Sequence, residues 1–400
     1  MNQPDTILPP LTERSGILRW LRHNLFGTWL DGLLTVFGLL LIYLAAKGLL
    51  TWIFTIAEWD VVVANLRLFM IGQFPLEQVG RLWVGLGFLL FLTGNSLAIW
   101  DKRSYIAAIL VLAFPLFLAF LPFDSNTRQW LIFLTATGAI GWGLGFSNPQ
   151  ALKKTVVAGW IISLPIIVLL TRGFTDPEAG GAIAIVGTNL WGGLLLTFLL
   201  TVVANIFSFP LGLFLALGRR SELPIIRWFS VGYIELVRGV PLITILFMAQ
   251  LMLPLFVPGG MDIDRVLRAM VGMTLFSAAY LAENVRGGLQ AIPKGQFEAA
   301  HALGLSGAKT MIFVILPQAL RLIIPILVGQ FISVFKDTAL VAIVGLFDLL
   351  GIARTVLSQP EFIGLHREVY AFVSLLYWVL SYAMSYISQR LETSLGIGTR

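Results

Sequence analysis

The sequence has no cysteine, and charged residues make up only 12% of its 400 residues. Without cysteine, the chain cannot form disulfides, iron–sulfur clusters or thiolate zinc sites. A soluble globular domain has about 25% charged residues, so this chain has too little polar material to cover a core in water. The only histidines are His23, His301 and His366. They have no nearby set of ligating side chains, so we expect no metal site.

Apolar residues are abundant instead, at 58% of the chain with a mean hydropathy of +0.88. A helix needs about 20 mostly apolar residues to cross a bilayer. Ten segments fit this requirement: 33–57, 82–100, 105–122, 130–147, 155–171, 191–218, 240–257, 266–284, 320–344 and 369–388. The sequence therefore predicts an all-α polytopic membrane protein with about ten transmembrane helices.

The first apolar segment needs a decision between a signal peptide and a membrane span. Residues 33–46 (LLTVFGLLLIYLAA) resemble the apolar core of a signal peptide, but about thirty residues precede them and LLTWIF follows Lys47. We therefore expect a first span here. The preceding stretch ILRWLRHNLFGTWL mixes basic and aromatic residues, which predicts an amphipathic helix lying at the membrane interface.

Lysine and arginine in the connections give an orientation. They occur about twice as often in the connections on the side of the N-terminus as on the other side. The opposite topology would place GRRSELPIIR (218–227) and DKR (101–103) outside. We therefore expect both termini in the cytoplasm. The net charge of +6 then reflects this bias toward anionic lipid rather than nucleic-acid binding.

The chain divides into two blocks of spans. Residues 1–171 hold the interfacial helix and five additional spans with few polar residues, and 172–189 form a glycine-rich extracytoplasmic linker. Residues 190–388 hold five further spans and nearly all the unusual polar residues, followed by a cytoplasmic tail at 389–400. We find no repeat between the blocks, which weakens the case for the inverted repeats of many secondary transporters.

One connection, EAAHALGLSGAKTMIFVILP at 298–317, is too polar to cross a membrane. Strong helix formers precede Gly304, a residue that commonly ends helices. Ser306 can cap a second helix, which Pro317 is expected to interrupt. The pattern predicts helix, glycine turn and helix on the cytoplasmic surface. We expect Ala299, Ala300 and Leu303 on one face, fitting either a groove on another protein or lipid headgroups.

This stretch resembles the EAA loop of bacterial ATP-binding-cassette (ABC) importer permeases. The matching residues are Glu298, Ala299, Ala300, Gly304, Val314, Leu316 and Pro317, with Val314 in place of the commoner isoleucine. The segments YIELVRGVPLITILF (233–247), YLAENVRGGLQAIPKGQFEAAHALGL (280–305) and LPQALRLIIP…QFISVFKDTAL (316–340) are similar to histidine/glutamine-type amino-acid permeases. The similarity covers about residues 190–388. The N-terminal addition resembles the larger permeases of general L-amino-acid transporters.

The resemblance implies a type I ABC importer transmembrane domain in the inner membrane of a bacterium. Residues 286–317 would form the coupling loop that seats in a cytoplasmic ATPase, with Glu298 paired to a nearby arginine and Gly304 permitting the turn. The implied partners are two ATPase subunits carrying ATP and Mg²⁺, a second homologous permease (giving a heterodimer or a homodimer) and an extracytoplasmic amino-acid-binding protein. We expect no cofactor on this chain and no ATPase activity, because GLSGAKT (304–310) lacks the glycine spacing of a phosphate-binding loop.

Polar residues at membrane depth suggest a substrate path. Lys336 and Asp337 lie inside the expected span 320–344, where an ionised group costs about 2.5–3.5 kcal/mol on insertion scales. Asp337 would accept a hydrogen bond from the ammonium group of an amino-acid substrate, and Gln330 or Lys336 would donate one to the carboxylate of the substrate. Ser333 lies near the same stripe, and Gln250 either lines the path or bonds a neighbouring helix. The alternative for the charged residues is a structural ion pair between spans.

A second polar group lies at the cytoplasmic ends of the spans. Glu283 and Asn284 stand beside Arg286, and Glu235 and Arg238 precede Pro241. These residues form either a cytoplasmic gate or structural pairs. On the opposite side, the amphipathic run 346–357 (LFDLLGIARTVL) is expected to lie flat on the outer surface.

Two other functions compete with an ATP-driven importer. An ion-driven secondary amino-acid transporter would need no ATPase and would leave the EAA loop unexplained. A membrane enzyme would need a clustered set of histidine, aspartate or serine residues, and the sequence offers none.

Overall fold

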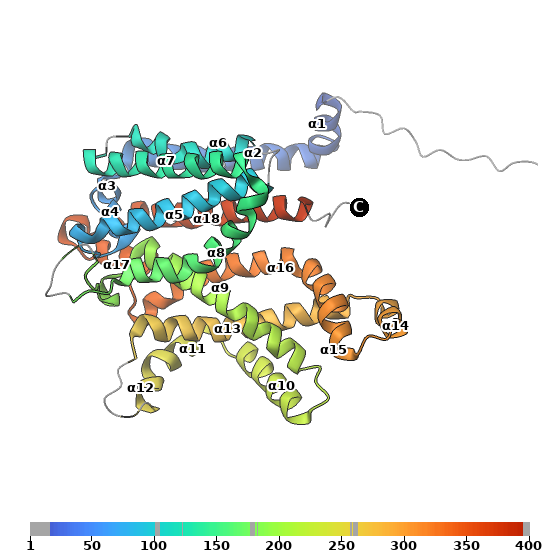
Figure 1. Ribbon diagram of the computed structural model, residues 1–400. Coiled ribbons are helices and arrows are strands. Elements are labelled where there is room, and N and C mark those ends of the chain that lie inside the picture. Colours follow the sequence, from blue (N-terminus) through green and yellow to red (C-terminus); the bar gives the residue numbers. More distant parts are fainter. Residues whose placement is uncertain are drawn as a thin grey trace, which may run out of the picture. The chain divides into compact units, whose positions relative to one another are not determined.

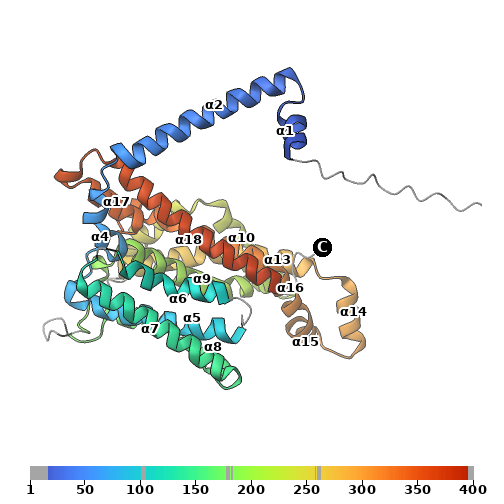
Figure 2. The same cartoon turned by 90° about the horizontal axis from the view of Figure 1, so that it is seen from above.

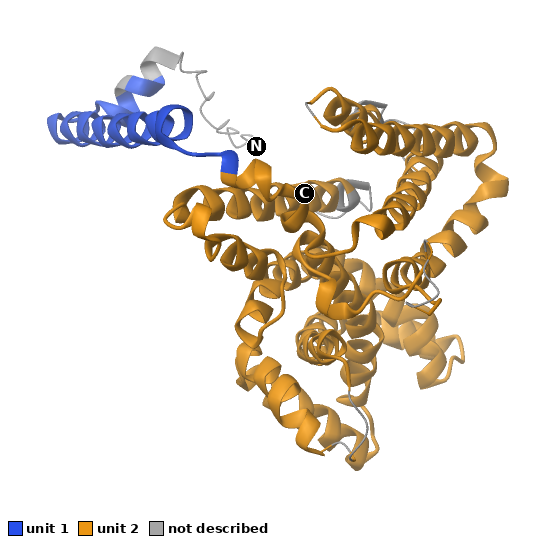
Figure 3. Ribbon diagram, turned by 90° about the vertical axis from the view of Figure 1, so that its left-hand side faces the viewer, with its two compact units in different colours: residues 1–60 blue, residues 61–400 orange. Residues whose placement is uncertain are grey.

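The computed structural model describes residues 17–100, 105–121, 123–176, 181, 183–256, 258 and 263–394. Within these ranges the chain is helical, with isolated β-bridges only, and the predicted all-α class is confirmed. The chain separates into two compact units, residues 1–60 and 61–400 (Figure 3). Unit 1 contains α1 (Ile17–Leu25), α2 (Trp29–Thr51) and the π-helical segment η1 (Trp52–Ile56).

Helix α2 is the first expected span. Its N-terminus is a capping box in which the Thr28 side chain accepts a hydrogen bond from the Asp31 N–H (3.2 Å) and the Asp31 carboxylate accepts one from the Thr28 N–H (3.0 Å). Among the described residues, none of α2 is buried. An exposed helix that is apolar on all sides suits a bilayer rather than water.

Unit 2 begins with short helices and a helical group that packs through glycine. Helix α5 packs against α7 and α8, and α6 packs against α7. A Cβ added at Gly94 would collide with the Gly138 carbonyl, and one at Gly141 would collide with the Phe91 carbonyl. Small residues allow this close approach of membrane helices. The elements are α3 (Asp60–Ala64), α4 (Leu66–Ile71), η2 (Leu76–Gln78), α5 (Val79–Trp100), α6 (Tyr105–Ala119), α7 (Ser125–Ser147) and α8 (Pro149–Arg172).

The C-terminal helices of unit 2 form the second group. Helix α9 packs along α13, which also contacts α10 and α16, and α16 packs against α18 (Figures 1 and 2). The elements are η4 (Thr188–Leu190), α9 (Gly193–Gly218), α10 (Pro224–Gly239), α11 (Leu242–Phe247), η5 (Met248–Met252), α12 (Leu253–Phe256), α13 (Arg265–Gln290), α14 (Lys294–Ala302), α15 (Gly307–Thr310), η6 (Met311–Ile315), α16 (Leu316–Asp337), η7 (Thr338–Val344), α17 (Leu349–Leu357), η8 (Pro360–Phe362) and α18 (His366–Ser394).

Eight helices among the described residues are long and apolar enough to cross a membrane, and a bent pair makes a ninth. The pair joins α10 to α11–α12 at an angle of 105°. Pro241 stands at the bend and has no N–H to continue the helix. The expected span 105–122 appears as α6, whose 15 residues are fewer than the about 20 needed to cross. Residues 101–104 and 122, next to α6, lie outside the described residues.

The N-terminal helices of unit 2 are built into the C-terminal group through α4. The Phe69 side chain is fully buried, with its ring 5.1 Å from that of Phe372 in α18. Gly72 has a φ of 65°, and a Cβ there would lie 2.5 Å from the Gly192 Cα. The Gln359 amide donates to the Asn65 side-chain oxygen at 3.2 Å. The predicted linker 172–189 falls inside unit 2. The predicted division of the chain into two domains at this linker stays a prediction.

The expected surface helix at 346–357 is instead buried. Residues 349–357 form α17, in which Arg354 is the one exposed residue. Leu349, Ile352 and Val356 are almost fully buried, because α9, α4 and α18 all pack against α17. The prediction of a helix lying on the outer surface missed this burial, because an amphipathic pattern does not show which neighbouring helices cover the apolar face.

Candidate functional site

The EAA stretch has the local structure predicted for it. Helix α14 ends in a Schellman motif, in which the Leu305 N–H donates to the Ala300 carbonyl (3.1 Å) and the Gly304 N–H donates to the His301 carbonyl (2.9 Å). Gly304 has a φ of 77°, a left-handed conformation that glycine adopts without a Cβ penalty. Helix α15 follows, so helix, glycine turn and helix are all present. Figure 1 shows α14 and α15 projecting from unit 2.

The exposed face of α14 differs from the predicted one. Ala300 is only 3% exposed, and the partly buried Phe297 packs against a buried cluster that includes Ile292 and Ile315. Ala299 and Glu298 are exposed, and Leu303 is 82% exposed. The prediction that Ala299, Ala300 and Leu303 form one docking face was wrong for Ala300, which is buried as part of the inward side together with the half-buried Phe297. Within the described residues, Glu298 has no ion pair.

The second half of the stretch enters α16 without a break. Ser306 occupies the N-cap of α15, but its side chain makes no capping hydrogen bond. The π-helical segment η6 then connects α15 to α16, which begins at half-buried Leu316. Pro317 therefore does not end a helix: it stands where the π-helical segment η6 passes into α16, inside one helical run from Gly307 to Val344.

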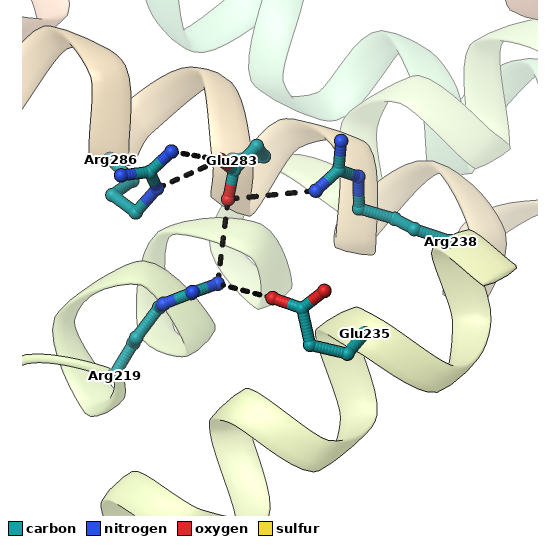
Figure 4. Close-up of polar contacts among 5 residues, drawn as sticks. All are labelled: Arg219, Glu235, Arg238, Glu283 and Arg286. Carbon is teal, nitrogen blue, oxygen red and sulfur yellow. Dashed lines mark hydrogen bonds and ion pairs between the residues drawn. The ribbon is translucent and has the colours of Figure 1, made fainter.

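A cluster of ion pairs joins the ends of α9, α10 and α13 (Figure 4). The Glu283 carboxylate pairs with Arg286 on the same helix, with Arg219 at 3.5 Å and with Arg238 at 3.8 Å. Arg219 also pairs with Glu235 at 3.0 Å. The Glu283 side chain is only 20% exposed, so its charge depends on these partners. We call these five residues the ion-pair cluster.

Four members of the ion-pair cluster were predicted as a group, and the fifth was missed. Arg219 is the C-cap of α9, and its only signal in the sequence was the basic pair that follows an apolar run. A basic residue at a helix C-terminus is common, so that signal does not distinguish an ion-pair partner. The cluster contains three arginines and two glutamates, and it fixes three helix ends to one another.

Asn284 does not belong to the ion-pair cluster. Its side-chain amide donates to the Gln330 oxygen at 2.6 Å, and the Gln330 amide donates to the Ser277 carbonyl at 2.9 Å. These bonds join α13 to α16 in the middle of the C-terminal group. A candidate gate residue and a candidate path residue are therefore bonded to each other, which the sequence did not indicate.

The remaining candidate path residues are dispersed. Ser333 and Lys336 are exposed on α16, and Asp337 is half-buried as the last residue of that helix. Gln250 is buried in η5, where its amide donates to the Arg265 carbonyl at 2.6 Å. The backbone carbonyl of Gln250 accepts a hydrogen bond from the Arg268 guanidinium at 2.6 Å. Gln250 therefore bonds a neighbouring helix, one of the two predicted alternatives.

Known proteins similar to this chain are transport permeases. The family described as "Binding-protein-dependent transport system inner membrane component" matches residues 208–396. The inner membrane amino-acid ABC transporter permease protein YhdY of Escherichia coli is 40% identical over 394 residues, 98% of this chain and 96% of the relative. The glutamate/glutamine/aspartate/asparagine transport system permease protein BztC of Rhodobacter capsulatus is 38% identical, over 97% of this chain and 95% of the relative.

A solved structure also matches half of the chain. The crystal structure of an amino acid ABC transporter with histidines has 33% identity and a TM-score of 0.46, covering 50% of this chain and 92% of that chain. The two relatives match over nearly their whole lengths, and both are named as transport permeases. The ion-driven alternative therefore has no support. This chain belongs to the family of binding-protein-dependent transport system inner membrane components, as an amino-acid ABC transporter permease.

Proposed function

We propose that this chain forms the substrate path of an ATP-driven amino-acid importer and couples to separate ATPase subunits by alternating access. The observation that carries the coupling is the projecting pair α14–α15. Glu298, Ala299 and Leu303 are exposed, whereas Ala300 is buried and Phe297 packs against a buried cluster of side chains. A small exposed face with one carboxylate and one apolar side chain suits a cleft on a partner protein.

The proposed complex contains two ATPase subunits carrying ATP and Mg²⁺, a second homologous permease and an extracytoplasmic amino-acid-binding protein. The chain would lie in the inner membrane with both termini in the cytoplasm, as its distribution of lysine and arginine favours. The family match at 208–396 lies almost wholly in the proposed permease domain 190–388. Residues 1–171 would add membrane helices, and 389–400 would form the tail, of which 395–400 lie outside the described residues.

An exposed line of residues along α16 ends in two polar side chains. Leu322, Ile326, Gly329, Ser333 and Lys336 recur at spacings of three or four residues and are all exposed. Lipid disfavours a charge such as that of Lys336, so we propose that this line faces the path or a second subunit. Gln330 and Asp337 would lie beside it, and Gln250 would serve helix packing. Unchanged uptake and substrate affinity in a normally assembled Asp337→Ala variant would contradict a contact with substrate.

The coupling assignment is tested with Glu298→Lys and Gly304→Asp. Each variant should insert into the membrane, lose co-purification with the ATPase subunits and lose ATP-dependent uptake across a panel of acidic, neutral and basic amino acids. Glu222→Lys reverses a charge on another exposed connection and is the control. It should retain uptake. ATPase assembly and transport that survive both test substitutions would rule the assignment out.

A further inference from the structure

Two consecutive arginines at the end of α9 contact two different elements. The Arg220 guanidinium lies over the Phe297 ring of α14, 5.9 Å from its centroid. The Arg219 guanidinium pairs with Glu235 of α10 and Glu283 of α13. Both backbone N–H groups continue the hydrogen bonding of α9, Arg219 to the Leu215 carbonyl and Arg220 to the Leu217 carbonyl. The end of α9 therefore touches the projecting helix on one side and the ion-pair cluster on the other.

Close packing against α10 makes this helix end suited to transmit a displacement. Gly218 lies directly against Ser230 of α10, where a Cβ would collide with the serine hydroxyl, and close-packed interfaces shift as units rather than deform. Helix α14 meets its neighbours through individual side chains: Arg220 of α9 lies over Phe297, and the Gln318 amide of α16 donates to the Gln296 oxygen at 3.1 Å.

The far side of the ion-pair cluster lies at the bend between α10 and α11. Glu235 stands one turn before Gly239, the last residue of α10. Arg238 pairs with Glu283 at 3.8 Å and lies over the Tyr280 ring of α13 at 5.5 Å. A movement of the α9 end therefore acts on charges beside the bend of 105°.

We propose that Arg219 and Arg220 are positioning residues that link the coupling helix α14 to the α10–α11 bend, so that ATPase-driven movement of α14 shifts the bend through the ion-pair cluster. The inference rests on the proposed function of α14. It adds a route into the membrane along α9, besides the direct covalent connections of α14 to α13 and of α15 to α16.

The two contacts differ in expected strength. An exposed cation–π contact such as Arg220–Phe297 changes an equilibrium by about two- to five-fold. Arg219 bridges two carboxylates, and its loss leaves Glu235 without its described partner. Because lysine is a point charge that cannot match the forked guanidinium, Arg219→Lys should recover coupling only in part. Arg220→Lys and Phe297→Tyr keep a cation and a ring, so they should retain most of it.

The test uses the complete transporter in liposomes and measures amino acid transported per ATP hydrolysed. Arg220→Ala and Phe297→Leu should each lower this ratio about two- to five-fold, while the ATPase subunits still co-purify. Because Phe297→Leu already removes the contact that Arg220→Ala removes, the double variant should be no worse than Phe297→Leu alone. Arg219→Ala should lower the ratio further. Arg227→Ala, an exposed arginine on α10, is the matched control and should leave the ratio unchanged.

Three results would overturn the link, and each differs from failure of the proposed function. An unchanged ratio in Arg220→Ala and Phe297→Leu would show that the contact transmits nothing, and additive effects would show that the residues act separately. Loss of ATPase co-purification in Arg220→Ala would place this residue in the docking surface instead. If the unmodified chain fails to co-purify with ATPase subunits, or if ATPase assembly and transport survive both Glu298→Lys and Gly304→Asp, the proposed function itself fails.

Discussion

Arg81 offers a direct test of how the N-terminal helices hold the linker. Its guanidinium lies in α5 and is buried, with the side chain only 6% exposed. It donates to the Ala184 carbonyl at 2.8 Å and to the Thr171 carbonyl at 3.0 Å, and it lies 5.1 Å from the centre of the Phe74 ring. One side chain thereby joins α5, the end of α8 and the linker that leads to α9.

Replacing Arg81 with alanine removes these contacts together. Each of the two buried carbonyls left without a donor costs about 1–3 kcal/mol, and the desolvated cation–π contact contributes about 2 kcal/mol. Part of this loss is offset, because burying a guanidinium is costly and its Nε has no hydrogen-bond partner among the described residues. We estimate a net loss of about 3 kcal/mol for local opening of the linker, or about a 100-fold change in its equilibrium.

Hydrogen exchange of the full chain in detergent measures this opening locally. The Ile185 N–H donates to the Thr175 carbonyl at 2.9 Å, and the Val186 N–H donates to the Arg172 carbonyl at 2.7 Å. Peptides with these two amides should exchange about 100-fold faster in Arg81→Ala, whereas peptides from α13 should be unchanged. Arg172→Ala, which removes an exposed side chain, is the control. Unaltered exchange at Ile185 and Val186 would refute the clamp.

Two further predictions address other buried contacts. Burial raises the pKa of Asp348 from its ordinary 3.8 to about 6 despite hydrogen bonds from Leu350 and Gly351, so its contribution to stability is full below pH ~4 and is lost as the pH rises through 6. Asp348→Asn keeps a capping oxygen but carries no charge. As the pH rises from about 4 to above 6, the free energy of unfolding of this variant should increase relative to that of the unmodified chain by at most about 3 kcal/mol. A difference that does not depend on pH would contradict this. Gly141→Ala should lower the unfolding temperature, because the added methyl group forces α5 away from α7 at a cost of about 1–3 kcal/mol. Gly143 has open space around it, so Gly143→Ala should leave the unfolding temperature unchanged. Equal effects of the two substitutions would contradict the close packing.

Composition and hydropathy were enough to predict the class of fold and most of the spans. A run of about 20 apolar residues is a property of the chain itself, because the thickness of the bilayer sets the length. The turn at Gly304 was also predictable, since the Schellman motif depends on a local left-handed residue. These features need no information about which helices are neighbours.

The ion-pair cluster could be predicted only in part, because its members come from three helices. Glu283 and Arg286 lie three residues apart on one helix, and Glu235 and Arg238 lie likewise on another. Local spacing identifies each pair but does not show that the pairs meet. Arg219, which bridges Glu235 and Glu283, depends on the packing of α9 against both helices, and no local pattern encodes that packing.

The burial of α17 shows a more general limit in a membrane chain. In water, an apolar face must be covered by protein, so amphipathicity indicates burial. In a bilayer, lipid satisfies an apolar face as well as protein does, so the same pattern fits a surface helix and a buried one. Two polar contacts distinguish a buried helix from a surface helix here. Asp348 caps α17 from a buried position, and Gln359, just beyond α17, donates a hydrogen bond to Asn65. Buried polar groups require specific partners, so these residues, rather than the apolar face, mark α17 as packed against protein.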